Sequence, residues 1–213
     1  MGSCQRKEKE KSIRTEDILN AAEKVFFSKG VENSTMDDIA KEAEYSKRTL
    51  YAYFESKEQL YNAIILRAFN VLKVICDGEL NKSSAMSGLE KTILIVRTFM
   101  AFMDKYPNYF KAISQYESWK IELTETDRIK AACHSEEGNS FNTVIRLVNE
   151  GIRDGSIRDD IDAVSTAYIL YANVLGVGNI IMNKGKHICR NYDKQTTEVI
   201  EEMFRFIERS LRK

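Results

Sequence analysis

Cationic and tyrosine side chains gather in one short stretch of this sequence, and they are the residues best suited to chemistry. The stretch begins at Ser46 and contains Lys47, Arg48, Thr49, Tyr51 and Tyr53. Long cationic side chains can bond phosphates or the O6 and N7 atoms of guanine, while hydroxyl groups and rings can contact phosphate oxygens and thymine methyls. The combination indicates a surface that contacts nucleic acid.

Two short helices joined by a tight turn are expected to position these side chains. Thr35 can cap the first helix, and Asp38 can close a capping box with it. Ser46 can cap the second helix, so that the cations stand in its exposed first turn while Leu50 and Phe54 pack inward. Two helices arranged in this way form a helix-turn-helix, whose second helix enters the major groove of DNA.

A long helix is predicted to follow, because Ser56 begins an S-x-x-Q capping box. Lys57 then lies in the first helical turn, where the helix dipole disfavours a positive charge. A nearby phosphate would account for that placement, and the backbone amides at 57–59 could bind the same phosphate.

The whole chain is predicted to be helical, since it has one proline and long stretches of Ala, Leu, Ile, Glu and Lys. We expect an all-α fold of about nine or ten helices, in which a three-helix DNA-binding domain is joined by a long helix to a larger helical domain. The expected divisions are a flexible arm over 1–12, the helix-turn-helix domain over 13–55, and an effector-binding and dimerisation domain over 56–213. The first helix is expected to start at about Thr15 and to end at Gly30.

A dense pattern of residue types runs through residues 14–61. It comprises Ile18, Leu19, Ala21, Ala22, Phe26, Gly30, Ser34, Thr35, Ile39, Ala40, Ala43, Ser46, Thr49, Leu50, Tyr51, Tyr53, Phe54, Ser56, Lys57 and Glu58. This pattern resembles the N-terminal signature of the TetR (tetracycline-repressor-like) transcription regulators. One position departs from it, because the turn reads Ala-Glu-Tyr-Ser where the family usually has Ala-Gly-Val-Ser. Glu44 must then adopt a backbone conformation that glycine adopts more easily, at a cost of about 1 kcal/mol.

The resemblance implies a homodimer that places two recognition helices in successive major grooves of a palindromic operator, with half-site centres roughly 34–36 Å apart. Repression is the usual mode of action in the family. The positions that the resemblance and the capping pattern together place at DNA are Ser34, Thr35, Ser46, Lys47, Arg48, Thr49, Tyr51, Tyr53 and Lys57.

The C-terminal region is rich in aromatic residues, which suit either a helical core or a largely apolar effector site between helices. The candidates for lining such a site are Phe102, Tyr116, Trp119, Phe141 and Tyr171. The last two helices, expected at about 162–183 and 196–211, are the candidate dimer interface. Gly176 and Gly178 lie in the first of them, where the close approach of another helix would compensate for their low helix propensity.

The charge of the chain argues against a non-specific architectural DNA-binding protein. Lys and Arg together number 32, as do Asp and Glu, so the formal net charge is zero. Non-specific affinity for DNA comes mainly from cations on phosphates. A specific DNA-binding protein of this composition must concentrate its positive charge on one face.

Enzymatic and metal-dependent functions are the remaining alternatives. The sequence contains no HExxH, GxSxG, phosphate-loop or dinucleotide motif, and Cys133 and His134 are adjacent, which suits a nucleophile and its base poorly on a helix. We therefore predict that the chain is not an enzyme and needs no cofactor. His187 and Cys189 leave open a metal-responsive regulator. Scattered cysteines and a charged, non-apolar N-terminus predict a cytoplasmic protein.

Overall fold

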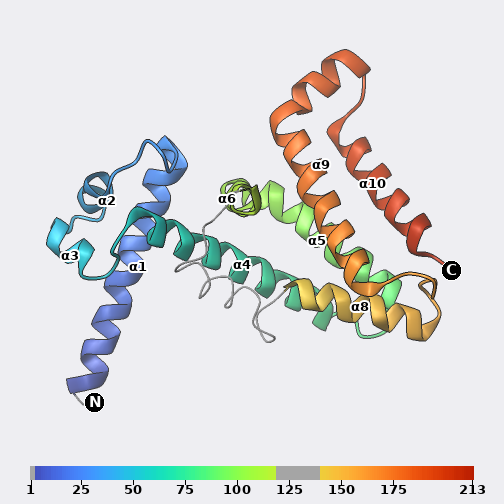
Figure 1. The fold of residues 1–213 in the computed structure, drawn as a ribbon, viewed down its shortest axis with the longest axis horizontal. Helices are drawn as coiled ribbons and strands as arrows, with labels where there is room; N and C mark the ends of the chain where they lie inside the picture. The colour runs from blue at the N-terminus through green and yellow to red at the C-terminus, as the bar shows by residue number, and fades with distance from the viewer. Residues whose placement is uncertain (1–2, 119–139) are drawn as a thin grey trace. The chain divides into compact units, whose positions relative to one another are not determined.

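The computed structural model describes residues 3–118 and 140–213, and these residues are almost entirely helical. In those two ranges the helices are α1 (Ser3–Lys29), α2 (Met36–Glu42), α3 (Lys47–Tyr51), α4 (Lys57–Asn81), α5 (Gly88–Lys105), α6 (Pro107–Ser118), α8 (Ser140–Asp154), α9 (Ala163–Tyr192) and α10 (Thr196–Leu211) (Figure 1). One isolated antiparallel bridge joins Ile157 and Arg212. The prediction of an all-α fold is confirmed.

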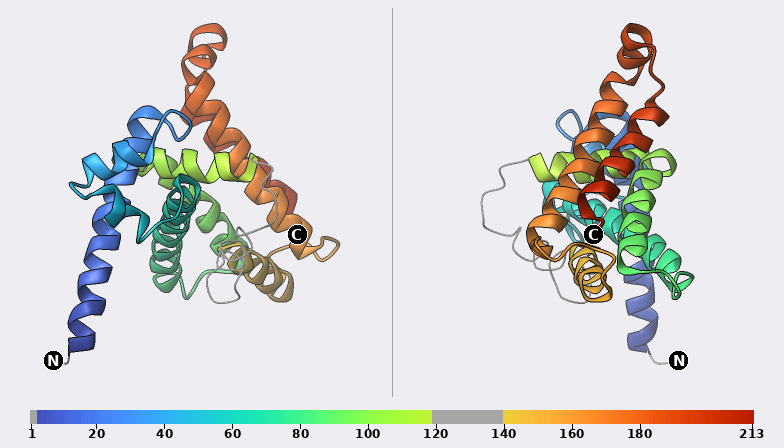
Figure 2. Two further views of the ribbon diagram at one scale, coloured as in Figure 1. Left: turned by 60° about the vertical axis from the view of Figure 1, so that its left-hand side comes forward. Right: turned by 90° about the vertical axis from the view of Figure 1, so that its right-hand side faces the viewer.

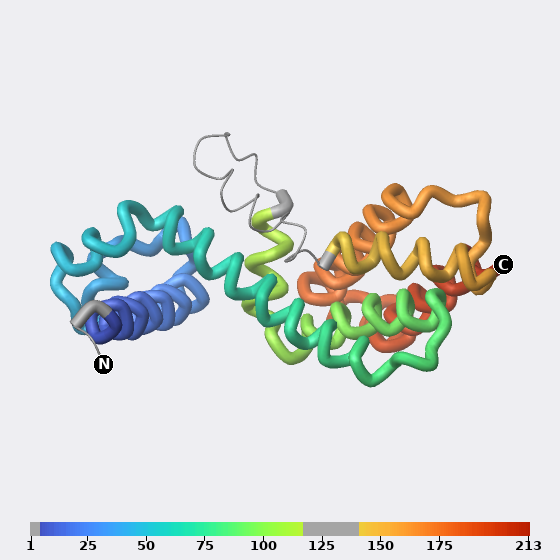
Figure 3. The backbone as a smooth tube through the Cα atoms, turned by 90° about the horizontal axis from the view of Figure 1, so that it is seen from below, coloured from blue at the N-terminus to red at the C-terminus, as the bar shows by residue number. Residues whose placement is uncertain are grey.

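The chain divides into two compact units, and the division falls inside α4. The described residues of the first unit end at Arg67, and those of the second begin at Ala68. The first turns of α4 belong with α1–α3 (Figure 3), because Tyr61 packs edge-on against Phe26 at 5.9 Å between ring centroids and Arg67 pairs with Glu23 at 2.8 Å. The sequence-based boundary at residue 55 lies before these contacts.

Helix α1 is longer than the sequence pattern predicted. It begins at Ser3, well before Thr15, so the segment expected to be a flexible arm is helical from its third residue. Its side chains from residue 5 to residue 13 are exposed, as expected. No proline or glycine lies between Ser3 and Arg14, and the Lys, Glu, Gln and Arg residues there favour a helix, so α1 extends beyond the part that has a core to pack on. The helix ends as predicted at Gly30, whose φ is +81°.

The second unit is built around α5, which packs against α6, α8, α9 and α10. Helices α5 and α8 cross at two glycines: a Cβ atom on Gly88 would lie 2.1 Å from the backbone nitrogen of Gly151. Ser87 caps α5 and forms a capping box with Glu90. Large side chains that include Phe102, Phe110 and Leu147 fill the core between these helices.

Helices α9 and α10 run antiparallel and side by side (Figures 1 and 2). Helix α9 continues to Tyr192, beyond the expected end at about residue 183, and Asp193 ends it with a φ of +49°. A Cβ atom on Gly178 would lie 2.3 Å from the Cζ atom of Phe110, whereas nothing lies within 4 Å of the same position on Gly176. The helix that closely approaches Gly178 is therefore α6 of the same subunit, whose Phe110 ring fills the space beside this glycine.

Helix α9 is long and apolar enough to cross a membrane when only its length and composition are considered. However, it packs against α5, α6, α8 and α10 within a helical unit. Only 22% of its most apolar window is buried. One part of α9 is therefore packed in this unit and another part is exposed.

Candidate nucleic-acid interface

Helix α2 is held by the capping box that the sequence predicted. The Asp38 amide donates to the Thr35 hydroxyl oxygen at 3.1 Å, and the Thr35 amide donates to the Asp38 carboxylate at 3.0 Å. Lys29, at the end of α1, donates to the same carboxylate at 2.8 Å. The Lys29 and Thr35 hydrogen bonds together lower the pKa of Asp38 to about 2. Asp38 therefore stays charged at neutral pH and joins α1 to the start of α2.

The turn between α2 and α3 has the geometry expected from its unusual residue. Glu44 has a φ of +57°, so the expectation that it must adopt a glycine-like conformation is confirmed. The Glu44 amide donates to the carbonyl of Lys41 at 3.2 Å and the Tyr45 amide to that of Ala40 at 3.0 Å. The Tyr45 hydroxyl donates to Asp17 at 3.0 Å, and this hydrogen bond raises the pKa of Tyr45. The turn is thus tied to α1.

Replacing Glu44 by glycine is expected to stabilise the protein. Glycine removes the steric cost of a positive φ, which is about 1 kcal/mol, and part of that gain is offset by the greater entropy of the unfolded chain. We expect the free energy of unfolding to rise by up to about 1 kcal/mol in urea denaturation. Lys41→Gly, an exposed change inside α2, is the matched control and should lower that free energy by about 1 kcal/mol. A loss of stability in Glu44→Gly would contradict the assignment of strain to this turn.

Helix α3 presents one face to solvent and the other to the core. Ser46 caps it: the Thr49 amide donates to the Ser46 hydroxyl at 3.1 Å, and the two hydroxyls lie 2.9 Å apart. Leu50 and Phe54 are buried, as predicted. The exposed face carries Lys47, Arg48 and Tyr51.

The two cations of α3 differ in their surroundings. Lys47 forms an ion pair with Asp37 of α2, and both side chains are more than half exposed. No ion pair or hydrogen bond of the Arg48 side chain is found in the part of the chain that the structure describes. Because a guanidinium can bond a guanine edge through two parallel N–H groups, Arg48 is the best placed of the two to read a base.

Replacing Asp37 by asparagine is expected to tighten DNA binding. The change removes a carboxylate beside the recognition surface and releases Lys47 to bond a phosphate. An exposed ion pair is worth about 0.2–1 kcal/mol, so two copies in a dimer should raise affinity by about 2-fold to 30-fold, measured by fluorescence anisotropy at low salt. Asp77→Asn is the control, because Asp77 forms a similar exposed pair with Lys73 in the second unit. Unchanged or weaker binding by Asp37→Asn would show that Lys47 does not contact DNA.

Ser34 and Lys57 lie together, but their polar groups are occupied within the protein. Ser34 is 3% exposed, and its hydroxyl donates to the carbonyl of Gly30 at 2.6 Å. The Lys57 ammonium donates to the carbonyls of Ser34 and Glu32 at 3.1 and 3.3 Å. A cation in the first turn of α4 is therefore explained without a phosphate, and the Ser34 hydroxyl is not available to DNA in this structure.

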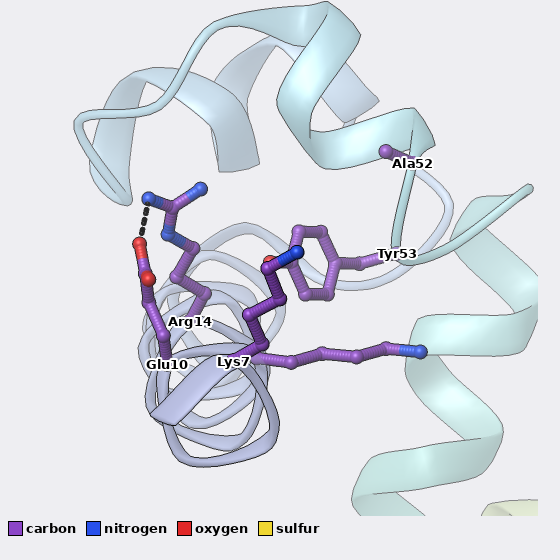
Figure 4. A pocket seen from close by; sticks show the side chains of 6 residues that line it. Lys7, Glu10, Arg14, Ala52 and Tyr53 are labelled. Carbon is purple, nitrogen blue, oxygen red and sulfur yellow. Dashed lines mark hydrogen bonds and ion pairs between the residues drawn. The ribbon is translucent and has the colours of Figure 1, made fainter. Parts of the chain in front are cut away.

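Tyr53 follows α3 and is half-buried, and its ring points toward the N-terminal part of α1 (Figure 4). Together with Ala52 it forms one wall of a hollow whose other wall is α1, with Lys7, Glu10, Lys11 and Arg14. These α1 residues were not among the predicted DNA contacts. Their spacing was the available signal, since positions 7, 11, 14 and 18 lie on one face of a helix.

The predicted effector-site residues fall into two groups. Phe102 and Tyr116 are buried, and the Phe102 ring lies 5.1 Å from that of Tyr106. Phe141 and Tyr171 are half-buried, and their ring centroids lie 6.3 Å apart in an edge-to-face arrangement. Trp119 lies outside the described residues.

His187 and Cys189 both lie on α9, so the two side chains point in directions about 200° apart. They cannot share an ion from these positions. The His187 ring nitrogens lie 3.1 and 3.2 Å from the side-chain Nδ2 atom of Asn191. Within residues 3–118 and 140–213, no three His, Cys, Asp or Glu side chains come together to hold a metal.

Comparison with protein families places the N-terminal unit among known DNA-binding proteins. Residues 18–64 match the family described as "Bacterial regulatory proteins, tetR family". The match contains all of α2 and α3 and the first turns of α4.

Two curated relatives are transcription factors. The chain is 28% identical over 167 residues to the HTH-type transcriptional repressor BepR of Brucella suis. The aligned region covers 77% of this chain and 78% of BepR. It is 36% identical over 67 residues to IcaR, the HTH-type negative transcriptional regulator of the biofilm operon of Staphylococcus aureus, covering 32% of this chain and 36% of IcaR. Only the first of these likenesses extends far beyond the N-terminal unit.

The described fold is also similar to that of solved regulators. The transcriptional regulator FadR from Bacillus subtilis, solved in complex with stearoyl-CoA, superposes with a TM-score of 0.69 and 17% identity, covering 91% of this chain and 97% of FadR. At this identity the likeness concerns the fold alone.

Proposed function

Because this chain is a helix-turn-helix transcriptional regulator of the TetR family, we propose that it is a homodimeric cytoplasmic repressor that binds a palindromic operator and leaves it when a small, largely apolar effector binds. The family consists of transcription regulators and not of enzymes. The single observation that carries the DNA-binding part is the solvent-exposed face of α3, which is capped at Ser46 and held by core residues on its other side.

The operator contacts that we propose come from α3 and the residues that follow it. Arg48 and Lys47 reach base edges and phosphates, and Tyr51 and Tyr53 supply ring surface and hydroxyls. The remaining predicted residues act mainly by holding this surface in place: Thr35, Ser46 and Thr49 through helix capping, and Ser34 and Lys57 through the joint between the first loop and α4. We therefore propose that these five residues support the DNA-contacting surface mainly through bonds within the protein, whereas the sequence pattern predicted that they contact DNA themselves.

The dimer interface that we propose is formed by α9 and α10, two helices from each subunit. Ile169, Gly176 and Ile180 lie on one exposed stripe of α9 at helical spacing. Val177 of the same helix borders a groove whose opposite side includes Phe206 of α10. Phe206 is 65% exposed and Ile169 is 60% exposed. Large apolar side chains on two adjacent helices are typical of a surface that a second subunit covers.

The effector proposal rests on the aromatic residues between helices of the second unit. Phe141 and Tyr171 are accessible in part, and Tyr171 also lies 5.8 Å from Phe99 in the core. An apolar ligand inserted among such rings would favour a different packing of these helices. The solved complex of FadR with stearoyl-CoA is an instance of this fold binding an acyl chain. To release DNA, the effector must bind more tightly to a conformation whose recognition helices fit the operator poorly.

Selection of bound duplexes from a random pool tests the DNA-binding part of the proposal. We expect a palindromic sequence whose half-site centres are one helical turn apart, or a small multiple of it. Recovery of no enriched sequence, or of single half-sites only, would contradict a dimeric operator-binding protein.

Titration of the selected duplex complex with a long-chain acyl-CoA, a free fatty acid and a polar control nucleotide tests the effector part. We expect at least one apolar probe to lower operator affinity by 5-fold or more, within the usual range of coupling between sites. Equal affinity with saturating amounts of each probe would reject an apolar effector of this class and leave the DNA-binding proposal intact.

A further inference from the structure

Three cations in the exposed N-terminal half of α1 lie on the same helix face as a core residue in its buried half. Lys7, Lys11 and Arg14 precede Ile18 at intervals of four, three and four residues, so the four side chains lie on one face. Ile18 is fully buried in the first unit. One face of α1 therefore packs against the helix-turn-helix from Ile18 onward and is cationic in the exposed turns before it.

This cationic face of α1 meets the end of the recognition helix. Lys7, Lys11 and Arg14 line a hollow with Ala52 and Tyr53, the residues that directly follow α3 (Figure 4). Glu10 also lines it, and its carboxylate accepts a hydrogen bond from Arg14 at 2.5 Å. That pair neutralises itself, so the two lysines determine the net charge of the hollow.

Three lysines of the helix-turn-helix domain are already paired with carboxylates. Lys29 pairs with Asp38, Lys24 with Glu42, and Lys47 with Asp37. No ion pair of Lys7 or Lys11 is found among residues 3–118 and 140–213. In a chain with zero net charge, unpaired lysines beside the DNA-contacting surface are available to bind phosphates without first breaking an ion pair.

We propose that Lys7 and Lys11 of α1, with the Tyr53 hydroxyl, bind the phosphodiester backbone of DNA next to the base pairs that α3 contacts. This inference rests on the proposed function and adds a second contact region to it. The ammonium groups and the hydroxyl donate hydrogen bonds to phosphate oxygens, which fixes the recognition helix in its groove without reading sequence. The helical extension of α1 keeps both lysines on the side of Tyr53.

The salt dependence of binding tests this site in the full-length dimer. Each phosphate contact contributes about 0.9 to the slope of log affinity against log salt concentration. For Lys7→Ala/Lys11→Ala, which removes four lysines per dimer, we expect the slope to fall by about 3 to 4. Affinity should fall at least 10-fold at 0.15 M salt, by the same factor for the selected operator and for a random duplex. Alanine favours a helix, so α1 should remain helical by circular dichroism.

Arg6→Ala/Lys9→Ala is the matched control. It removes the same charge from the same turns of α1, but positions 6 and 9 lie away from the face that carries 7 and 11. The control should change the slope by less than 1. Equal slopes for the two double variants, or a Lys7→Ala/Lys11→Ala slope equal to that of the unchanged protein, would overturn the phosphate site while operator binding persisted. If the unchanged protein bound no duplex at all, both the proposed function and this site would be wrong.

Discussion

Replacing Arg48 by alanine is expected to lower operator affinity by roughly 30-fold to 25,000-fold. A bidentate contact to a base is worth about 1–3 kcal/mol, and the proposed dimer has two copies of it. Arg48 is exposed in α3, and no partner of its side chain is found within the described ranges, so its loss should leave the free energy of unfolding unchanged. Fluorescence anisotropy with the selected operator measures the effect.

Two further variants separate base reading from charge. Arg48→Lys keeps the positive charge but loses the planar fork, so it should lose affinity for the operator and retain affinity for a random duplex. Arg153→Ala removes an exposed arginine from α8 in the second unit and should change neither affinity. If Arg48→Ala lowered binding to both duplexes equally, Arg48 would contact phosphates and a different residue would read the bases.

Replacing Phe206 by glutamate is expected to convert the protein into a monomer. Phe206 is 65% exposed on α10 and borders the groove between α9 and α10. A carboxylate there would be left without water or a partner when a second subunit covered it. A monomer binds one half-site instead of two, and the loss of bivalent binding should lower operator affinity by about 100-fold or more. Sedimentation velocity measures the oligomeric state.

Val74→Glu is the matched control for the interface variant. Val74 is also a large apolar residue, 71% exposed, but it lies on α4. The same substitution at that position should leave both the oligomeric state and operator affinity unchanged. A dimeric Phe206→Glu protein, or a monomeric Val74→Glu protein, would show that α9 and α10 are not the interface.

The local features of the helix-turn-helix could be predicted from the sequence because each depends on residues close together in the chain. The capping box joins Thr35 and Asp38, and the Ser46 cap joins Ser46 and Thr49; each pair spans one helical turn. The positive φ of Glu44 follows from its position just after α2. Burial of Leu50 follows from the spacing of apolar residues.

The roles of individual polar side chains were predicted less well, because each depends on a partner far away in the sequence. Lys57 donates to carbonyls of the loop after α1, and Lys47 pairs with a carboxylate of α2. Periodicity places both lysines on the surface but does not reveal these partners. Gly178 is a similar case, since its low helix propensity predicted the close approach of another helix but did not reveal that the approaching side chain is Phe110 of α6.

Sequence alone therefore determined the fold class, the helix-turn-helix and the exposed face of its second helix, since capping, helix propensity and hydrophobic spacing act over one or two turns. Tertiary structure decided which cations remain unpaired beside that face. The sequence predicts only that the charged start of α1 is solvated. The structure shows that Lys7 and Lys11 lie beside Tyr53, which follows more than forty residues later in the chain. Electrostatic complementarity to DNA arises from such distant neighbours, because charge acts through space and not along the sequence.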